Sequence, residues 1–168
     1  MNIQEVIKKL PQQALKNKKA HLKTIQQIKV LKSMDADELF HTQHEEAFSE
    51  IDCLKCANCC KTTPPLLLNE DINSISKGLH LSTKKFMSEY VKKDEDGDFI
   101  FNETPCPFLG SDNFCSIYSF RPQACREYPH THQKKVQKIL DLTVKNAEIC
   151  PAVARILDNI SSSLSLGK

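Results

Sequence analysis

The stretch CLKCANCC, residues 53–60, places four of the chain's eight cysteines within a single short segment. Ordinary structural use of cysteine does not require this density, so the stretch indicates metal binding. Cysteines three residues apart can turn back toward one point, whereas the adjacent Cys59 and Cys60 must point in different directions, and one of them is expected to serve another contact or centre. The other cysteines are too far along the chain for a local knuckle: Cys106, Cys115, Cys125 and Cys150. The fold must bring them in, so metal binding and folding are expected to be coupled.

Length and composition limit the class of protein. A chain of 168 residues suits one domain, or one domain with a helical arm, and buries roughly 70% of its unfolded-state surface. Apolar residues make up 40%, but aromatic residues are few and Trp is absent, so a metal centre could replace part of the packing. The net charge of +2 argues against a general nucleic-acid binder.

The N-terminal segment shows no signal architecture, and no run approaches the ~18 apolar residues of a membrane span. We therefore expect a soluble, cytoplasmic protein that binds no membrane. Thiols stay reduced in the cytosol, which favours metal ligands over disulfides. Because eight is an even number, disulfide pairing stays open as an alternative.

The N-terminal third predicts a pair of helices of opposite charge. Residues 1–33 hold eight Lys and one Glu, whereas residues 34–52 hold seven acidic residues and no Lys or Arg, so the two helices are expected to fold against each other. Pro11 fits the start of a second helix better than a helix interior. Within that second piece the expected apolar stripe consists of Leu15, Leu22, Ile25, Ile28 and Leu31.

Turn and cap residues divide the middle of the chain. Residues 62–68 are expected to be extended, Asn69 is expected to cap a helix that Gly78 stops, and another helix begins at Ser82 or Thr83. The acidic turn at residues 94–98 resembles a calcium loop but lacks the closing Glu, so we interpret it as a solvated turn before a strand at residues 99–101.

These patterns predict a mainly α, irregular, small metal-centred domain with short extended segments and an N-terminal helical pair. We expect a helical arm over residues 1–51, the cysteine-cluster domain over residues 52–160 and a flexible tail over residues 161–168.

Three motifs together resemble a known family. They are the C-x2-C-x2-C-C run, the segment PCPFL at residues 105–109 and the pattern C-x-I-Y-x2-R-P-x2-C-R-x-Y-P at residues 115–129. The combination resembles the YkgJ-type cysteine-cluster family of zinc- or iron-chelating CxxCxxCC domains. This resemblance implies metal chelation through Cys53, Cys56, Cys59, Cys60, Cys106, Cys115, Cys125 and Cys150. Flagellin lysine N-methylases are similar through the same domain, but nothing here resembles their additional length.

The chemistry of the thiols leaves two metals open. Cys53, Cys56 and Cys59 have the spacing of the first three ligands of a ferredoxin-type [4Fe–4S] cluster, and Cys150-Pro151 matches the ending of such runs. Zinc accepts four thiolates equally well. We favour an iron–sulfur cluster; eight thiols could form two four-ligand sites or one site and a redox pair.

The expected function is metal binding in electron transfer, redox sensing or metal-dependent modification, with an unidentified protein or redox partner. The alternative is a structural zinc module for protein interaction, and an enzyme with an open metal position comes third.

Arg121 and Arg126 flank Cys125 and could donate hydrogen bonds to sulfur, or form a surface ion pair. His130 and His132 are expected to be spare surface histidines.

Overall fold

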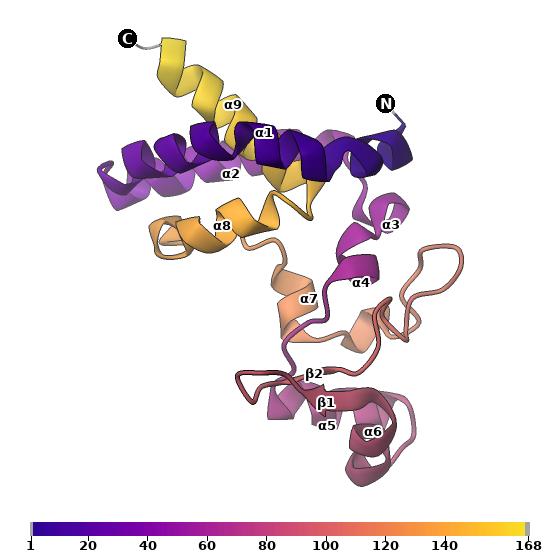
Figure 1. Cartoon of the computed structure of the whole chain (residues 1–168). Helices are drawn as coiled ribbons and strands as arrows, with labels where there is room; N and C mark the ends of the chain where they lie inside the picture. Colours follow the sequence, from indigo (N-terminus) through magenta and orange to yellow (C-terminus); the bar gives the residue numbers. More distant parts are fainter. Residues whose placement is uncertain (1, 167–168) are drawn as a thin grey trace. The chain divides into compact units, whose positions relative to one another are not determined.

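The computed structural model describes residues 2–166 and divides into two compact units (Figure 1). The first, here the helical unit, comprises Met1–Cys56 and Pro129–Lys168. The second, here the inserted unit, is Ala57–Tyr128. The chain thus leaves the helical unit after Cys56 and returns at Pro129, so the cysteine run at residues 53–60 is shared between the two units.

The helical unit is built on α9, Pro151–Leu166, which packs against both N-terminal helices, α1 (Ile3–Lys29) and α2 (Ser33–Glu50). Its shorter elements are α3 (Cys53–Cys56), the 3-10 helix η2 (Val136–Ile139) and α8 (Leu140–Asn146). The largest fully buried side chains of this unit are Leu10, Ile25, Ile28, Phe40, Leu140, Ile156, Leu157 and Ile160. Each such burial contributes about 1.5–3 kcal/mol. The core is therefore mainly aliphatic and is made by long helices.

Helix α1 continues through Pro11, where the sequence predicted a break. Proline inside a helix costs about 3 kcal/mol because it removes one backbone hydrogen bond. Pro11 is exposed, however, while Leu10 and Ala14 beside it are buried, so the buried face of the helix passes it without interruption. Packing of that face against α9 outweighs the local preference for a break.

The apolar stripe predicted for this helix is wrong in part. Leu15 and Leu22 are 73% and 45% exposed. The buried face of α1 consists of Leu10, Ala14, His21, Thr24, Ile25 and Ile28. Ile25 and Ile28 of the predicted stripe are buried as expected, but two positions of the buried face are polar, which is why hydrophobicity alone selected Leu15 and Leu22 in their place.

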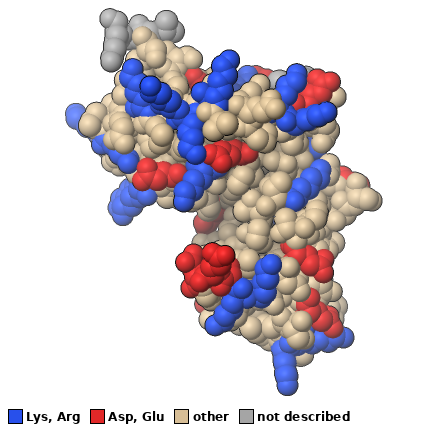
Figure 2. Space-filling view, viewed as in Figure 1, with Lys and Arg blue, Asp and Glu red and all other residues tan. Residues whose placement is uncertain are grey.

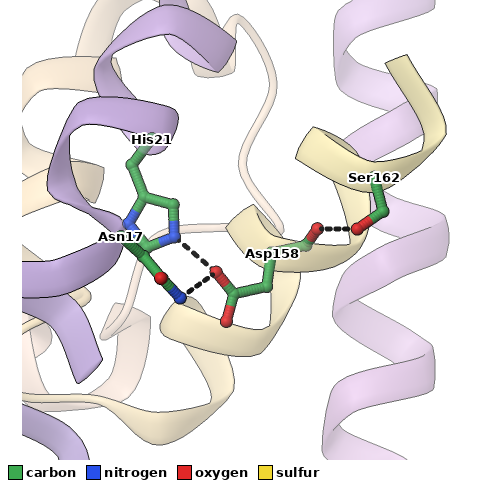
Figure 3. Close-up of polar contacts among 4 residues, drawn as sticks. All are labelled: Asn17, His21, Asp158 and Ser162. Atoms are coloured by element: carbon green, nitrogen blue, oxygen red, sulfur yellow. Dashed lines mark hydrogen bonds and ion pairs between the residues drawn. The ribbon is translucent and has the colours of Figure 1, made fainter. Parts of the chain in front are cut away.

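A polar contact explains the burial of His21 between α1 and α9 (Figure 3). Its Nε2 lies 2.7 Å from Oδ1 of Asp158, and Nδ2 of Asn17 donates to the same oxygen at 3.0 Å. The Asp158 carbonyl accepts from Oγ of Ser162 at 2.9 Å.

Helix α9 continues to Leu166, through most of the segment predicted as a flexible tail; Gly167 and Lys168 lie outside the described residues.

Charged side chains of the N-terminal helices pair with residues later in the chain. Lys18 and Lys29 of α1 pair with Glu148 and Asp141, and Glu50 of α2 pairs with Arg155 of α9. These residues therefore do not link α1 directly to α2. On the face shown in Figure 2, Lys and Arg are interspersed with Asp and Glu.

The inserted unit is made of short elements. They are α4 (Asn58–Thr62), α5 (Asn69–Gly78), α6 (Thr83–Tyr90), β1 (Val91–Lys93), β2 (Phe99–Phe101), the 3-10 helix η1 (Tyr118–Phe120) and α7 (Gln123–Glu127). Strands β1 and β2 pair antiparallel, with Val91 opposite Phe101. Oδ1 of Asp94 accepts from the amides of Asp96 and Asp98, so the predicted turn and the strand that follows it are confirmed.

The core of the inserted unit is smaller and more aromatic than that of the helical unit. Its buried residues are Leu67, Ile72, Ile75, Phe86, Phe101, Phe108 and Ile117. The rings of Phe101 and Phe108 meet edge to face at 5.2 Å between centroids. Cys106 and Cys115 pack against this core, which therefore supports the loops that carry them.

The predicted fold class, mainly α with short extended segments and an N-terminal helical pair, is confirmed. Among the described residues, no helix combines the length and the apolar character needed to cross a bilayer.

Candidate metal centre

The five cysteines of the inserted unit lie on two short helices and in two loops. Cys59 and Cys60 lie on α4, Cys125 lies on α7, and Cys106 and Cys115 lie in the loops between β2 and η1. Backbone contacts fix these loops: the amide of Cys106 donates to the carbonyl of Cys60 at 2.8 Å, and Cys115 forms a β-bridge with Leu109. The fold thus brings thiols from distant positions to one small unit.

Helix α7, which carries Cys125, is anchored by a buried carboxylate. Oδ1 of Asp71 accepts from the amide of Gln123 at 2.9 Å, and its Oδ2 accepts from the amide of Leu68 at 3.0 Å. The first contact holds the start of α7, and the second caps α5. A single side chain therefore fixes the position of Cys125 against α5.

Cys60 lies close enough to three other thiols, those of Cys106, Cys115 and Cys125, to raise the pKa of each. A hydrogen bond with Cys59, whose Sγ is 4.0 Å away, is the main cause that lowers the pKa of Cys60 to about 7. Burial, followed by the charges of Cys60, Cys106 and Cys115, raises the pKa of Cys125 to about 12. Burial raises the pKa of Cys106 to about 11 and also raises the pKa of Cys115, and Cys60 adds to both shifts. We call Cys60, Cys106, Cys115 and Cys125 the four-thiol set.

Arg121 supplies positive charge to this set. It lowers the pKa of Cys115 and of Cys125, against the dominant effect of burial. Its guanidinium lies 3.8 Å from the centroid of the Tyr118 ring and donates to the Tyr118 carbonyl at 2.6 Å. Arg126 donates to the carbonyl of Arg121. The hydrogen bonds of the two predicted arginines described here therefore go to backbone carbonyls, and the effect of Arg121 on Cys115 and Cys125 is that of its charge.

The other three cysteines lie in the helical unit. Cys53 and Cys56 are one turn apart on α3, which begins where Oδ1 of Asp52 accepts from the amide of Leu54 at 2.9 Å. Cys150 immediately precedes α9. Burial raises the pKa of Cys150 to about 12; hydrogen bonds from the backbone at the start of α9 lower it, and Cys53 and Cys56 raise it further. We call Cys53, Cys56 and Cys150 the three-thiol set.

Comparison with known proteins assigns this arrangement to a family. The family model CxxCxxCC, described as "Putative zinc- or iron-chelating domain", matches residues 52–151, more than half of the chain. The chain belongs to the CxxCxxCC family. The match includes every cysteine of both sets and confirms the resemblance drawn from the motifs. No curated protein and no solved structure matches the chain.

The donor atoms of this CxxCxxCC protein suit zinc and iron, the two metals named in the description of its family. Cys60, Cys106, Cys115, Cys125 and Cys150 are free thiols, and thiolates are preferred ligands of zinc and of iron–sulfur clusters. Among residues 2–166, no three His, Cys, Asp or Glu side chains lie close enough together in the structure to hold one metal ion. The chemistry of the donors fits. Binding at thiols with raised pKa values would displace their protons.

A histidine cluster in the helical unit was not predicted. His132, treated as a spare surface residue, stacks on His41 at 4.4 Å and approaches His44 at 4.9 Å between ring centroids. Nδ1 of His44 lies 2.8 Å from Oγ1 of the buried Thr131. No sequence spacing indicates this cluster, because two members come from α2 and the third from the segment after Pro129.

Proposed function

We propose that this CxxCxxCC protein holds an iron–sulfur cluster on Cys60, Cys106, Cys115 and Cys125 and serves electron transfer or redox sensing in the cytoplasm. The observation that carries the proposal is the placement of these four cysteines, from α4, α7 and two loops, in one small unit, where the other three each raise the pKa of Cys125. Four thiolates are the ligands that a [4Fe–4S] cluster takes.

The surroundings of the four-thiol set support a redox centre. Cys106 and Cys115 pack against an aromatic core that includes Phe108, which limits the access of water. Arg121 offsets part of the negative charge that four thiolates carry. Burial and positive charge near the sulfurs are the means by which a protein adjusts the reduction potential of a cluster. A protein or small redox partner would then exchange electrons with it.

A structural zinc site is the second candidate. The inserted unit has short elements and a small core, so a metal bound by thiols from α4, α7 and two loops would hold these segments together. Structural zinc contributes about 10–16 kcal/mol of apparent binding free energy in small domains. In this case the unit would present a surface to a protein partner instead of exchanging electrons.

Metal analysis of protein purified without oxygen or chelator separates these functions. Iron with an equal amount of acid-labile sulfide, and a visible absorption that dithionite bleaches reversibly, would support the iron–sulfur proposal. Zinc without sulfide would reject it in favour of the structural site. Protein that contains neither metal would contradict both, and the matched Cys125→Ser variant should then behave as the unsubstituted chain does.

A further inference from the structure

The outer side of helix α1 carries a ridge of exposed lysine and leucine side chains. Its members are Lys8, Leu15, Lys16, Lys19, Leu22 and Lys23. Spacings of three, four and seven residues place them on one side of the helix, away from the buried face that begins at Leu10 and ends at Ile28. We call these six residues the lysine–leucine ridge, and it lies wholly within the helical unit.

The positive charge of the ridge is not neutralised within the chain. Elsewhere on α1, Lys18 and Lys29 pair with Glu148 and Asp141. Within residues 2–166, in contrast, none of the ridge lysines forms an ion pair. Like charges three or four residues apart on a helix repel one another. Negative charge from a partner would therefore relieve a repulsion that the chain itself leaves in place.

Two leucines interrupt the positive charge. Leu15 is 73% exposed and Leu22 is 45% exposed. Their spacing of seven residues places them two turns and about 10 Å apart on the same side of the helix. The packed face of the same helix meanwhile buries His21 and Thr24, so apolar side chains stay in water where polar ones are buried. An apolar centre inside a polar rim is the usual anatomy of a protein interface.

We propose that the lysine–leucine ridge docks an acidic amphipathic helix of a partner protein. Apolar side chains of the partner would cover Leu15 and Leu22, and its carboxylates would pair with the ridge lysines. The inference goes beyond metal binding and holds for whichever metal the chain carries. It adds the surface through which the helical unit meets another protein, and the chemistry of that protein.

The composition of α1 favours a protein over a nucleic acid or a membrane surface. Its 27 residues contain no Arg, Phe, Tyr or Trp. Recognition of RNA commonly uses Arg and the stacking of bases on aromatic rings, and helices that lie in a membrane interface bury a broad apolar face. Two leucines among lysines offer neither. Their spacing instead matches apolar side chains on a facing helix, which recur once in each heptad.

Packing fixes the shape of the ridge before a partner arrives. On its other sides α1 contacts α3, α8 and α9. Asn17 and His21 lie at the same level as the ridge leucines, and both contact Oδ1 of Asp158 on α9, at 3.0 and 2.7 Å. A helix that is already ordered loses little conformational entropy on binding. The ridge is therefore a preorganised surface.

A synthetic peptide tests this surface on the full-length chain. The probe is a helical peptide with Leu at heptad spacing and Glu at the neighbouring positions of the same face; the control peptide has Gln in place of each Glu. Fluorescence anisotropy should show binding of the Glu peptide that weakens as salt is added, because salt screens exposed charges. The Gln peptide should bind about tenfold more weakly or less.

Matched charge reversals show whether the peptide binds at the ridge. The double variant Lys16→Glu/Lys23→Glu should weaken binding of the Glu peptide by about tenfold or more, because attraction becomes repulsion. Lys77→Glu/Lys84→Glu makes the same change of charge at exposed lysines of the inserted unit and should bind as the unsubstituted chain does. Far-ultraviolet circular dichroism would verify that both variants are folded.

A second pair of substitutions tests the apolar centre. Leu15→Gln/Leu22→Gln leaves the net charge unchanged and should weaken binding about three- to tenfold, because the partner then has no apolar side chains to cover. Equal binding by this variant and the unsubstituted chain would overturn the apolar part of the proposal.

Three other results would overturn the inference. The first is a Glu peptide that does not bind the unsubstituted chain, and the second is equal binding by Lys16→Glu/Lys23→Glu and Lys77→Glu/Lys84→Glu. The third is tighter binding of phosphatidylserine vesicles or single-stranded RNA than of the Glu peptide at the ridge, since the partner would then be a lipid surface or a nucleic acid. Metal content should be the same in all these variants, so the inference and the proposed function fail separately.

Discussion

The two units reach stability by different means. In the helical unit α9 packs along α1 and α2, and its core contains long aliphatic side chains such as Ile156 and Leu157. In the inserted unit the longest helix is α5, Asn69–Gly78, and the core depends on a few aromatic rings. The unit with less regular structure also carries more of the thiols.

This difference predicts which unit would depend more on a bound metal. Helix packing supplies a core without any ligand, so the three-thiol set is an addition to a fold that already has its own stability. The four-thiol set instead lies on α4, α7 and two loops, which are short segments held by the aromatic core, by Asp71 and by backbone contacts such as that between Cys106 and Cys60. Metal at that set would act as part of the core of the inserted unit.

The largest expected effect is therefore unit-specific loss of structure on metal removal. Anaerobic treatment with a chelator should abolish the hydrogen-exchange protection of amides in residues 57–128, while α1, α2 and α9 keep theirs. The reason is that bound metal can contribute about 10–16 kcal/mol to a small domain. Restoring the metal should restore protection. Equal loss in both units would contradict the comparison.

Truncation of the aromatic core should have the next largest effect. Phe86 is fully buried and stacks on Tyr90 at 5.6 Å. Phe86→Ala should destabilise the inserted unit by about 3–5 kcal/mol and lower its metal content, because the core supports the loops of Cys106 and Cys115.

The matched variants are Phe86→Leu, with a smaller loss of stability, and Leu157→Ala in the helical unit. Leu157→Ala should cost about 2–5 kcal/mol without loss of the metal held by the four-thiol set. Urea unfolding and metal analysis measure both properties. Equal metal loss in Leu157→Ala and Phe86→Ala would show that the two units do not act separately.

A smaller effect is expected at Asp71, which is buried and anchors α7. Asp71→Ala removes the acceptors of the Gln123 and Leu68 amides and should cost about 1.5–3 kcal/mol, since hydrogen bonds to charged groups are of this size. It should also weaken metal binding, because the start of α7 with Cys125 loses its anchor. Asp71→Asn keeps one acceptor and should weaken binding less. Unchanged metal affinity in Asp71→Ala would contradict this role.

Local signals in the sequence identified several elements correctly. Ser82 caps α6, as predicted, because its side chain accepts from the amide of Lys85. Gly78 ends α5 as predicted, and the strand at residues 99–101 follows a turn of acidic residues. Each of these depends on residues within one or two turns of the chain, which a sequence shows directly.

Features that depend on tertiary packing were not readable. The exposure of Leu15 follows from which face of α1 meets α9, and the continuity of α1 through Pro11 follows from the same contact. The cysteines were identified as candidate ligands, but their grouping into sets depends on where the chain returns to the helical unit, at Pro129. Spacing within CLKCANCC gives no sign that the run is divided after Cys56.

The smallest expected effect is a pH dependence confined to the helical unit. Burial, followed by the charges of His132 and His41, lowers the pKa of His44, and Glu45 opposes this shift. The unfolded chain therefore takes up a proton at His44 more readily than the folded chain does. Stability contributed by the neutral ring is present above the ordinary histidine pKa of about 6.5 and is lost as the pH falls through the lowered value.

Urea unfolding at about pH 8 and about pH 5.5, above and below the ordinary histidine pKa, measures the effect. The helical unit should be less stable at the lower pH, and His44→Gln should reduce this difference, because Gln carries no titrating group. His80→Gln, in the inserted unit, is the matched control and should keep the pH dependence of the unsubstituted chain. If His44→Gln and His80→Gln gave the same profile, the ring contacts among His41, His44 and His132 would not be the source of the acid sensitivity of the helical unit.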